Sequence, residues 1–200
     1  LHHDPALDRL PRAGIVHRLD KDTTGLMVVA RTLEARTSLV EQLQARTVKR
    51  EYDAVVQGHL IAGGTVDAPI GRHPVDRKRM AVREGGKPAV THFRVEEHFG
   101  SHTHVRASLE TGRTHQIRVH MAHIHHPLVG DPVYGGRFRK PAGASEALIE
   151  TLRGFPRQAL HARRLSLVHP VSGKTLHWEA PLPADMEALL AALRAEVDEE

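Results

Sequence analysis

The sequence predicts an α+β fold in which helices pack on a largely antiparallel sheet. Strand-like segments outnumber helix-like ones, and short turns join most of them, which favours antiparallel neighbours. The clearest hairpin pairs residues 91–95 with residues 104–110 across a connection at 100–103. Apolar residues share one face of its second strand, at Val105, Ala107 and Leu109. We therefore expect solvent on the opposite face, which carries His104, Arg106, Ser108 and Glu110.

The remaining elements follow from periodicity and from cap and turn residues. Short apolar runs typical of strands lie at residues 26–31, 52–58, 162–168 and 175–179, the last two joined by a turn at Ser172-Gly173. One helix is expected from a Thr32 cap to about Arg46, and a second at 114–123. A third opens at Pro183, with one apolar face made of Met186, Leu189, Leu190, Leu193 and Val197. Loops are expected at residues 1–14, 71–88 and 135–145.

Composition favours a polyanionic partner and excludes several kinds of site. The chain has 200 residues, 40% of them hydrophobic, with a formal charge of +4 and a pI of about 9.8. These values suit one or two domains with affinity for nucleic acid. Aromatic residues make up only 4%, which disfavours base stacking on exposed rings. Without cysteine there is no disulfide framework and no cysteine zinc site. No apolar run is long enough for a membrane span, so we expect a cytoplasmic protein.

The most informative segment is Gly14–Thr24, in which Asp20 lies among basic residues between two apolar runs. His17, Arg18 and Lys21 would keep this carboxylate ionised at neutral pH. A fixed, ionised Asp can serve as nucleophile, general base or metal ligand, and the neighbouring cations disfavour a metal ion.

Asp22 is a competitor for the same role, two positions along the chain. On a strand, Asp20 and Asp22 would share a face and form an acid pair of the glycosidase kind. In a turn, which Thr23, Thr24 and Gly25 favour, Asp22 would instead bond local backbone amides.

Five ordered blocks resemble the motifs of the RluA-type RNA pseudouridine synthases. They are His17–Gly25, Lys49–Tyr52, Gly112–His120, Gly130–Gly135, and Leu160–Ala162 with His169-Pro170. They cover nearly the whole chain and are most similar to the members that modify 23S RNA of the bacterial large subunit. The resemblance implies one catalytic domain over residues 1–200 with the pseudouridine synthase fold. It also implies that sheet strands and an S4-type RNA-binding domain, which family members carry before the first motif, are missing from this chain.

The resemblance further implies a role for individual residues. Asp20 would be the catalytic carboxylate, Arg118 the cation that pairs with it, and Tyr52 the ring that stacks on the target uracil and takes its C5 proton. Arg18 would fill the gap left by a flipped nucleotide, and Leu160 would form an apolar wall of the pocket. Further contacts to RNA are expected from His17, Arg113, His115, Arg77 and Lys78.

The implied reaction breaks the uracil–ribose C–N bond of a uridine and rejoins the same ring through carbon. Nothing leaves the nucleotide, so no cofactor or metal is required. Asp20 could attack the ribose C1′ or the uracil C6, or remove a ribose proton in the first variant, and the sequence does not separate these routes. The implied substrate is a stem-loop of 23S ribosomal RNA, free or in a pre-50S particle, and we expect a monomer.

Two other functions fit parts of the sequence. A noncatalytic RNA-binding or ribosome-assembly module on the same fold would share the basic clusters without needing Asp20. A metal-dependent hydrolase would use a run of histidines, two of which, His120 and His123, could meet on a helix face. That run comprises His115, His120, His123, His125 and His126.

Overall fold

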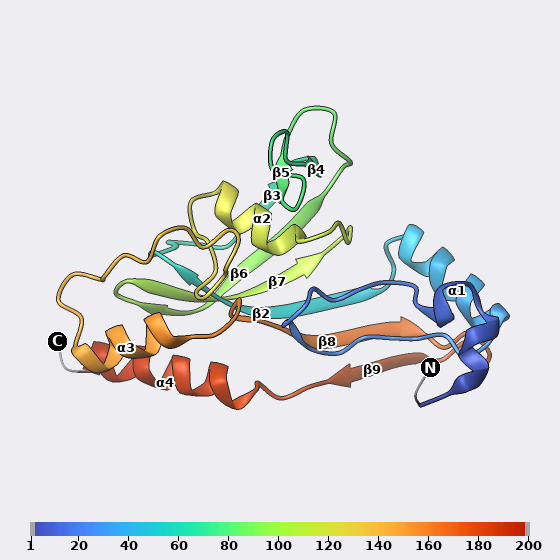
Figure 1. Cartoon of the computed structure of the whole chain (residues 1–200). Coiled ribbons are helices and arrows are strands. Elements are labelled where there is room, and N and C mark those ends of the chain that lie inside the picture. The colour runs from blue at the N-terminus through green and yellow to red at the C-terminus, as the bar shows by residue number, and fades with distance from the viewer. Residues whose placement is uncertain (1–2, 199–200) are drawn as a thin grey trace.

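The computed structural model describes residues 3–198 and confirms the α+β prediction (Figure 1). A seven-stranded sheet has the order β1-β8-β2-β7-β6-β3, with β9 also paired to β8, and β4 and β5 form a separate two-stranded hairpin. The pairings in the large sheet are antiparallel except that of β1 with β8. The strands are β1 (Thr24–Gly25), β2 (Lys49–Gln57), β3 (Gly64–Asp67), β4 (Ile70–Arg72), β5 (Met80–Val82), β6 (Val90–Phe99), β7 (His102–Leu109), β8 (Leu160–Val168) and β9 (Thr175–Glu179). The helices are α1 (Leu33–Gln44), α2 (Gln116–His123), α3 (Glu146–Gly154) and α4 (Ala184–Asp198).

Helices lie on both faces of the sheet, with α2 on one side and α3 and α4 on the other (Figure 1). The alternation of side chains along β2 supplies an apolar face to each layer. Tyr52 points toward α2, where it shares a core cluster with Ile117 and Met121. Val55 points the other way, into a cluster with residues of α3 and α4. The central strand is therefore buried on both faces, and residues on its α2 side are available to a site built there.

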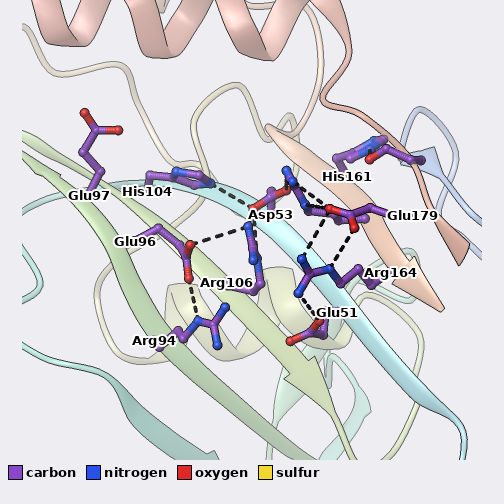
Figure 2. Close-up of polar contacts among 12 residues, drawn as sticks. Glu51, Asp53, Arg94, Glu96, Glu97, His104, Arg106, His161, Arg164 and Glu179 are labelled. Carbon is purple, nitrogen blue, oxygen red and sulfur yellow. Dashed lines mark hydrogen bonds and ion pairs between the residues drawn. The ribbon is translucent and has the colours of Figure 1, made fainter. Parts of the chain in front are cut away.

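The prediction that one face of β7 is solvated is wrong for its central residues. His104 and Arg106 are only 7% and 8% exposed, and they surround the fully buried Asp53 of β2 (Figure 2). Asp53 Oδ1 accepts hydrogen bonds from His104 Nε2 and Arg106 Nη2, both at 3.0 Å, and Arg163 Nη1 lies 3.3 Å from Oδ2. Burial alone would raise the pKa of Asp53, but these hydrogen bonds and the charge of Arg106 hold it at about 2. The alternating polar residues of β7 belong to a buried ionic network here, because polar groups that are buried pair with one another.

Several further elements differ from the prediction, including strand β3, which was not predicted. Residues 26–31 do not form a strand: Leu26 N bonds to Ala162 O and Ala30 N to Gly14 O, but β1 itself covers only Thr24–Gly25. The basic stretch 71–88 contains the β4–β5 hairpin and is not a loop throughout. Helix α3 was absent from the prediction, although its apolar residues Leu148, Ile149 and Leu152 are buried.

The other predicted elements are confirmed, with small shifts of their ends. They include α1, α2, the β6–β7 hairpin, the β8 and β9 strands with their turn, and the loop at 135–145. On α4 the predicted face is buried except for Val197, which is 44% exposed. Within the 1–14 stretch, residues 1–2 lie outside the described residues, and two short 3₁₀ turns occupy Pro5–Arg9 and Pro11–Gly14. Among residues 3–198, no helix is both long and apolar enough to cross a bilayer.

Candidate active site

Asp20 lies on a tight turn that a distant part of the chain holds in place. The backbone N–H of Thr23 donates to Asp20 O at 3.0 Å, and Asp22 has a positive φ of 67°. Gln158 Nε2 donates to Lys21 O at 2.7 Å and to the Thr23 hydroxyl at 2.9 Å. The segment is therefore a turn, and the two carboxylates do not form a strand pair. The Asp22 carboxylate is exposed and makes no hydrogen bond within residues 3–198, so its predicted bonding to local amides is wrong.

Arg157 links the same turn to the start of α4. Its Nη1 donates to the carbonyl oxygens of Asp22 and Leu160, each at 3.1 Å. Its Nε and Nη2 pair with the carboxylate of Asp185 at 2.8 and 3.0 Å. Arg157 is 8% exposed and its bonds to the carbonyl oxygens fix the turn, whereas the side chain of Asp185 is 35% exposed.

The chain leaves the turn through β1, and this exit requires glycine at position 25. Thr24 and Gly25 pair in parallel with His161 and Ala162 of β8. Gly25 has a φ of 109°, and a Cβ there would lie 2.1 Å from the carbonyl oxygen of Ala162. The Thr24 hydroxyl shares a hydrogen bond with His161 Nδ1 at 2.8 Å. The turn is thus seated directly against the sheet.

Arg118 of α2 connects Asp20 to a second carboxylate. Its Nη1 lies 3.2 Å from Asp20 Oδ2, while its Nε and Nη2 donate to Asp131 at 2.7 and 2.9 Å. Arg118 is 4% exposed. Burial opposes its charge, but the hydrogen bonds and charges of Asp131 and Asp20 raise its pKa above the ordinary value. Asp131 is itself held by the backbone N–H groups of Val133 and Tyr134, each at 2.9 Å. The arrangement orients Asp20 and keeps it next to a permanent cation.

Tyr134 packs against the same guanidinium and is itself contacted by His115. The Cζ atom of Arg118 lies 5.1 Å from the centre of the Tyr134 ring, a cation–π distance. The Tyr134 hydroxyl accepts from Met80 N at 2.9 Å and shares a hydrogen bond with His115 Nδ1 at 2.7 Å. Burial lowers the pKa of His115 below its ordinary value. Tyr134 therefore shields part of the guanidinium that contacts Asp20.

Asp20 faces a hollow between its turn, β2, and the loop that precedes α2. Most of the residues predicted for the site line this hollow, namely His17, Arg18, Asp20, Tyr52, Arg113, His115 and Leu160. Arg118 lies behind Asp20 and is not part of the lining. The Oδ1 atom of Asp20 makes no hydrogen bond with any residue of the described chain, so one carboxylate oxygen is available to a ligand.

Tyr52 and Leu160 form the apolar part of the hollow. Tyr52 is 6% exposed, and burial raises the pKa of its phenol above the ordinary value. The phenol therefore keeps its proton at neutral pH, which suits packing against a planar ring better than accepting a proton. Leu160 belongs both to the core cluster around α2 and to the lining.

The two basic residues before Asp20 differ in their surroundings. Arg18 is exposed at the mouth of the hollow. His17 is turned inward, where its Nε2 accepts a hydrogen bond from Val28 N at 2.9 Å. Burial and the nearby charge of Arg50 lower the pKa of His17 to about 4. His17 is consequently neutral at pH 7 and holds the loop in place, while Arg18 can meet an anion.

The basic residues predicted to contact RNA differ in their position relative to the hollow. Arg113 lines the hollow and its Nε donates to Pro88 O at 2.8 Å. Arg77 and Lys78 lie exposed in the turn between β4 and β5 and do not line the hollow. Their hairpin reaches the site through Arg79, whose Cζ is 5.5 Å from the Tyr134 ring centre.

The histidine run does not converge on a common point. His120 is fully buried, with Nδ1 bonded to the Thr91 hydroxyl and Nε2 to Ala68 O, and His126 Nδ1 bonds to Gln57 O. No group of three or more potential ligands among residues 3–198 is arranged to hold a metal ion. The geometry gives no support to the hydrolase alternative.

Two residues that sequence interpretation did not single out belong to this site. Asp131 binds Arg118, and the block Gly130–Gly135 that contains it was the available sign in the sequence. Arg50 is buried and lines the hollow beside Tyr52. Its spacing of two residues from Tyr52 on one strand places both on the same face, which the sequence could have indicated.

Comparison with known proteins identifies the family. The model of the RNA pseudouridylate synthase family matches residues 3–123, which includes the Asp20 turn, Tyr52 and Arg118. The chain belongs to this family. The resemblance drawn from five sequence blocks is therefore confirmed.

Relatives within the family are similar over nearly the whole chain. Ribosomal large subunit pseudouridine synthase D of Escherichia coli K12 is 65% identical over 199 residues, covering 100% of this chain and 61% of the relative. The synthase D of Pseudomonas aeruginosa PAO1 is 66% identical over 194 residues, covering 97% and 61%. The chain thus spans about three fifths of the length of these pseudouridine synthases.

A solved structure of a family member has the same fold. Human RNA Pseudouridylate Synthase Domain Containing 4 is 28% identical, with a TM-score of 0.71 over 90% of this chain and 75% of that chain. The pseudouridine synthase fold predicted from sequence is confirmed by this similarity.

Proposed function

We propose that the protein isomerises uridine to pseudouridine in the RNA of the large ribosomal subunit. The observation that supports this most directly is the state of Asp20: one carboxylate oxygen is bound to Arg118, and the other faces the hollow beside Tyr52. Relatives at 65% and 66% identity are named for the large ribosomal subunit, which supports that substrate class.

The reaction redistributes atoms within one nucleotide. The C1′–N1 bond breaks, the uracil turns in the hollow, and C5 forms a new bond to C1′. The C5 hydrogen leaves as a proton and N1 gains one, so the balance needs neither oxidant nor cofactor. Asp20 Oδ1 is the nucleophile at C1′ or at C6, or the base that removes a ribose proton in the first route.

Each neighbour of Asp20 has a task in this scheme. Arg118 keeps the carboxylate aimed and next to a positive charge, since its guanidinium is held at two points by Asp131. Tyr52 packs on the uracil ring and Leu160 forms the opposing apolar wall. Arg18, exposed at the mouth, fills the space that the extruded nucleotide leaves in the RNA and offsets part of the unstacking cost.

The partner in this proposal is a stem-loop of 23S ribosomal RNA, free or in a pre-50S particle, bound by a monomer in the cytoplasm. Five arginines line the hollow or the groove beside it, at Arg12, Arg18, Arg46, Arg50 and Arg113. Neutralisation of RNA phosphates by such residues releases counterions, so binding should weaken linearly on a log–log plot as salt increases.

The decisive experiment measures tritium release from 23S RNA transcript labelled at uridine C5, with the natural gene product that contains this chain. Wild type should release tritium, because the new carbon bond expels the C5 hydrogen. Asp20→Asn should release none while retaining RNA affinity. Asp22→Asn is the matched control, because it removes an exposed carboxylate from the same turn, and it should remain active.

The noncatalytic RNA-binding alternative makes the opposite forecast. It requires wild type to bind RNA without releasing tritium, and Asp20→Asn to sustain the cellular role of the protein. That pair of results would overturn the proposed function.

A further inference from the structure

Arg50 is a buried cation without a partner. It lies on β2, two residues before Tyr52 on the same face of the sheet, and is 7% exposed. Its guanidinium makes no hydrogen bond and no ion pair with any residue of the described chain, and its Nε is fully buried without an acceptor. Burial lowers the pKa of Arg50, yet an arginine remains charged at neutral pH. A desolvated charge of this kind is costly unless something pairs with it.

The position of Arg50 shows where such a partner would come from. Arg50 lines the hollow that contains Asp20 and also an adjoining groove between α1 and the loop before α2. The residues common to the two are His17, Arg18, Arg50, Gly112 and Arg113. A ligand that extends from the hollow into the groove must therefore pass Arg50.

Each carboxylate of these two cavities is paired with a cation other than Arg50. Asp20 is bound to Arg118, and Glu110, in the groove, is bound to Arg46 at 2.8 Å and to His92 at 2.6 Å. Within the described residues, no other Asp or Glu lines either cavity. The protein supplies Arg50 with no anion, and the local field favours an anionic ligand.

Gly112 keeps access to Arg50 open. A Cβ at Gly112 would lie 2.6 Å from Arg50 Nη1, so any larger residue would press on the guanidinium. Because Arg50 also lines both cavities, its side chain borders the surface that the hollow and the groove share. A planar guanidinium with paired N–H donors matches the oxygens of a phosphate group.

We propose that Arg50 binds a phosphate group of the RNA backbone next to the target nucleotide, while the target base lies against Tyr52. The inference rests on the proposed function for the identity of the ligand, and it adds a residue that positions the substrate. Arg50 and Tyr52 are about 7 Å apart along the strand. A nucleotide presents its base and its phosphate at opposite ends of the ribose, so one nucleotide can contact both residues.

The test neutralises either the phosphate group of the RNA or the guanidinium of Arg50. Short RNA substrates carry a neutral methylphosphonate at the phosphate 5′ or 3′ of the target uridine, and single-turnover tritium release and RNA affinity are measured with each. Wild type should lose about 10- to 100-fold in affinity or rate on one of the two RNAs, the effect of one lost charge-assisted contact. Arg50→Met should show the same loss on unmodified RNA and no further loss on that methylphosphonate RNA.

Matched variants separate this role from a general loss of positive charge. Arg194→Met removes an exposed arginine of α4, on the opposite side of the sheet, and should respond to the methylphosphonates as wild type does. Arg50→Lys should keep part of the sensitivity. Arg50→Met should be at least as stable as wild type in urea, because it removes an unpaired buried charge.

Additive losses in Arg50→Met and the neutral RNAs would overturn the proposal, as would a wild type that is indifferent to both methylphosphonates. The second result needs no variant to fold. If wild type releases no tritium at all, the proposed function fails, and the affinity measurements still decide whether Arg50 binds a phosphate.

Discussion

Replacing Asp131 by Asn changes one oxygen to an NH2 group at the centre of the site. Asp131 accepts four hydrogen bonds, two from Arg118 and two from the backbone N–H groups of Val133 and Tyr134. An Asn keeps one acceptor oxygen and presents two donors, and Arg118 has donors only. At least one charge-assisted hydrogen bond is lost, and the guanidinium is held at fewer points.

The expected magnitudes follow from these contacts. A hydrogen bond to a charged group contributes about 1.5–3 kcal/mol, and loss of a buried charge partner costs about 3–5 kcal/mol. We expect Asp131→Asn to lower the free energy of unfolding by about 3 kcal/mol at pH 7. If a similar energy is lost from the alignment of Asp20 in the transition state, the single-turnover rate falls about 10²-fold. RNA affinity should stay within about twofold, because Asp131 does not line the hollow.

The direction in which this loss of stability changes with pH follows from the pKa of Asp131. Burial alone would raise the pKa of Asp131, but the hydrogen bonds from Arg118 outweigh it and lower the pKa. The stabilising effect of this carboxylate is therefore present above the unfolded-state pKa of about 3.9 and is lost as pH falls through the folded-state value. Wild type and Asp131→Asn should thus converge in stability in acid.

The assay combines urea unfolding across pH with single-turnover tritium release at saturating enzyme. Glu97→Gln serves as a control, since it removes a partly buried carboxylate paired with Arg194 on the other side of the sheet. A folded Asp131→Asn variant that reacts at the wild-type rate would refute the reasoning that Arg118 must be anchored in order to orient Asp20.

Three other perturbations follow from the fold. Gly25→Ala should lower the free energy of unfolding in urea by about 3 kcal/mol or more, because its Cβ would lie 2.1 Å from Ala162 O in a strained backbone. Gly154→Ala has open space around it and should leave stability unchanged. Equal stability of the two variants would contradict this reasoning. Asp53→Asn should lower the free energy of unfolding by about 3–5 kcal/mol, because it breaks a buried ionic network. The tritium-release rate should stay unchanged, since this network lies on the face of the sheet away from Tyr52. A large loss of rate in folded protein would contradict this prediction. Burial lowers the pKa of His102 to about 4, so below pH 6.5 the unfolded protein binds a proton that the folded protein does not. The free energy of unfolding should therefore fall between pH 6.5 and pH 4, by at most about 3 kcal/mol from this residue. The His102→Gln variant should show a shallower decline over that pH range.

The ionic network in Figure 2 shows where periodicity reaches its limit as a predictor. Alternation in β7 correctly assigns Val105 and Ala107 to one apolar face. It says nothing about whether the polar face is wet, because that depends on Asp53 from β2 and Arg163 from a bulge in β8. Burial of polar residues is set by neighbours that the local pattern does not contain.

In the candidate site, too, the sequence predicts local features but not the distant residues that hold them. The turn at Asp20 was predictable from Thr23, Thr24 and Gly25, because these residues favour turns. The residues that hold it, Gln158 and Arg157, lie about 135 positions away and carry no local pattern. Helix α3 was missed because it is short and follows a loop rich in glycine and proline, although Ser145 caps it by accepting from Leu148 N.

The links from Arg157, Gln158 and His161 to the Asp20 turn also constrain how the protein becomes active during synthesis. They join residues separated by 133 to 137 positions, and Asp185, which holds Arg157, comes later still. Contacts of such long separation form late, since closing the intervening loop has an entropic cost. A nascent chain on the ribosome can therefore expose a finished hairpin at β6–β7 while the Asp20 carboxylate is still unplaced. Under the proposed function, activity on RNA should appear abruptly, once the beginning of α4 has emerged from the exit tunnel.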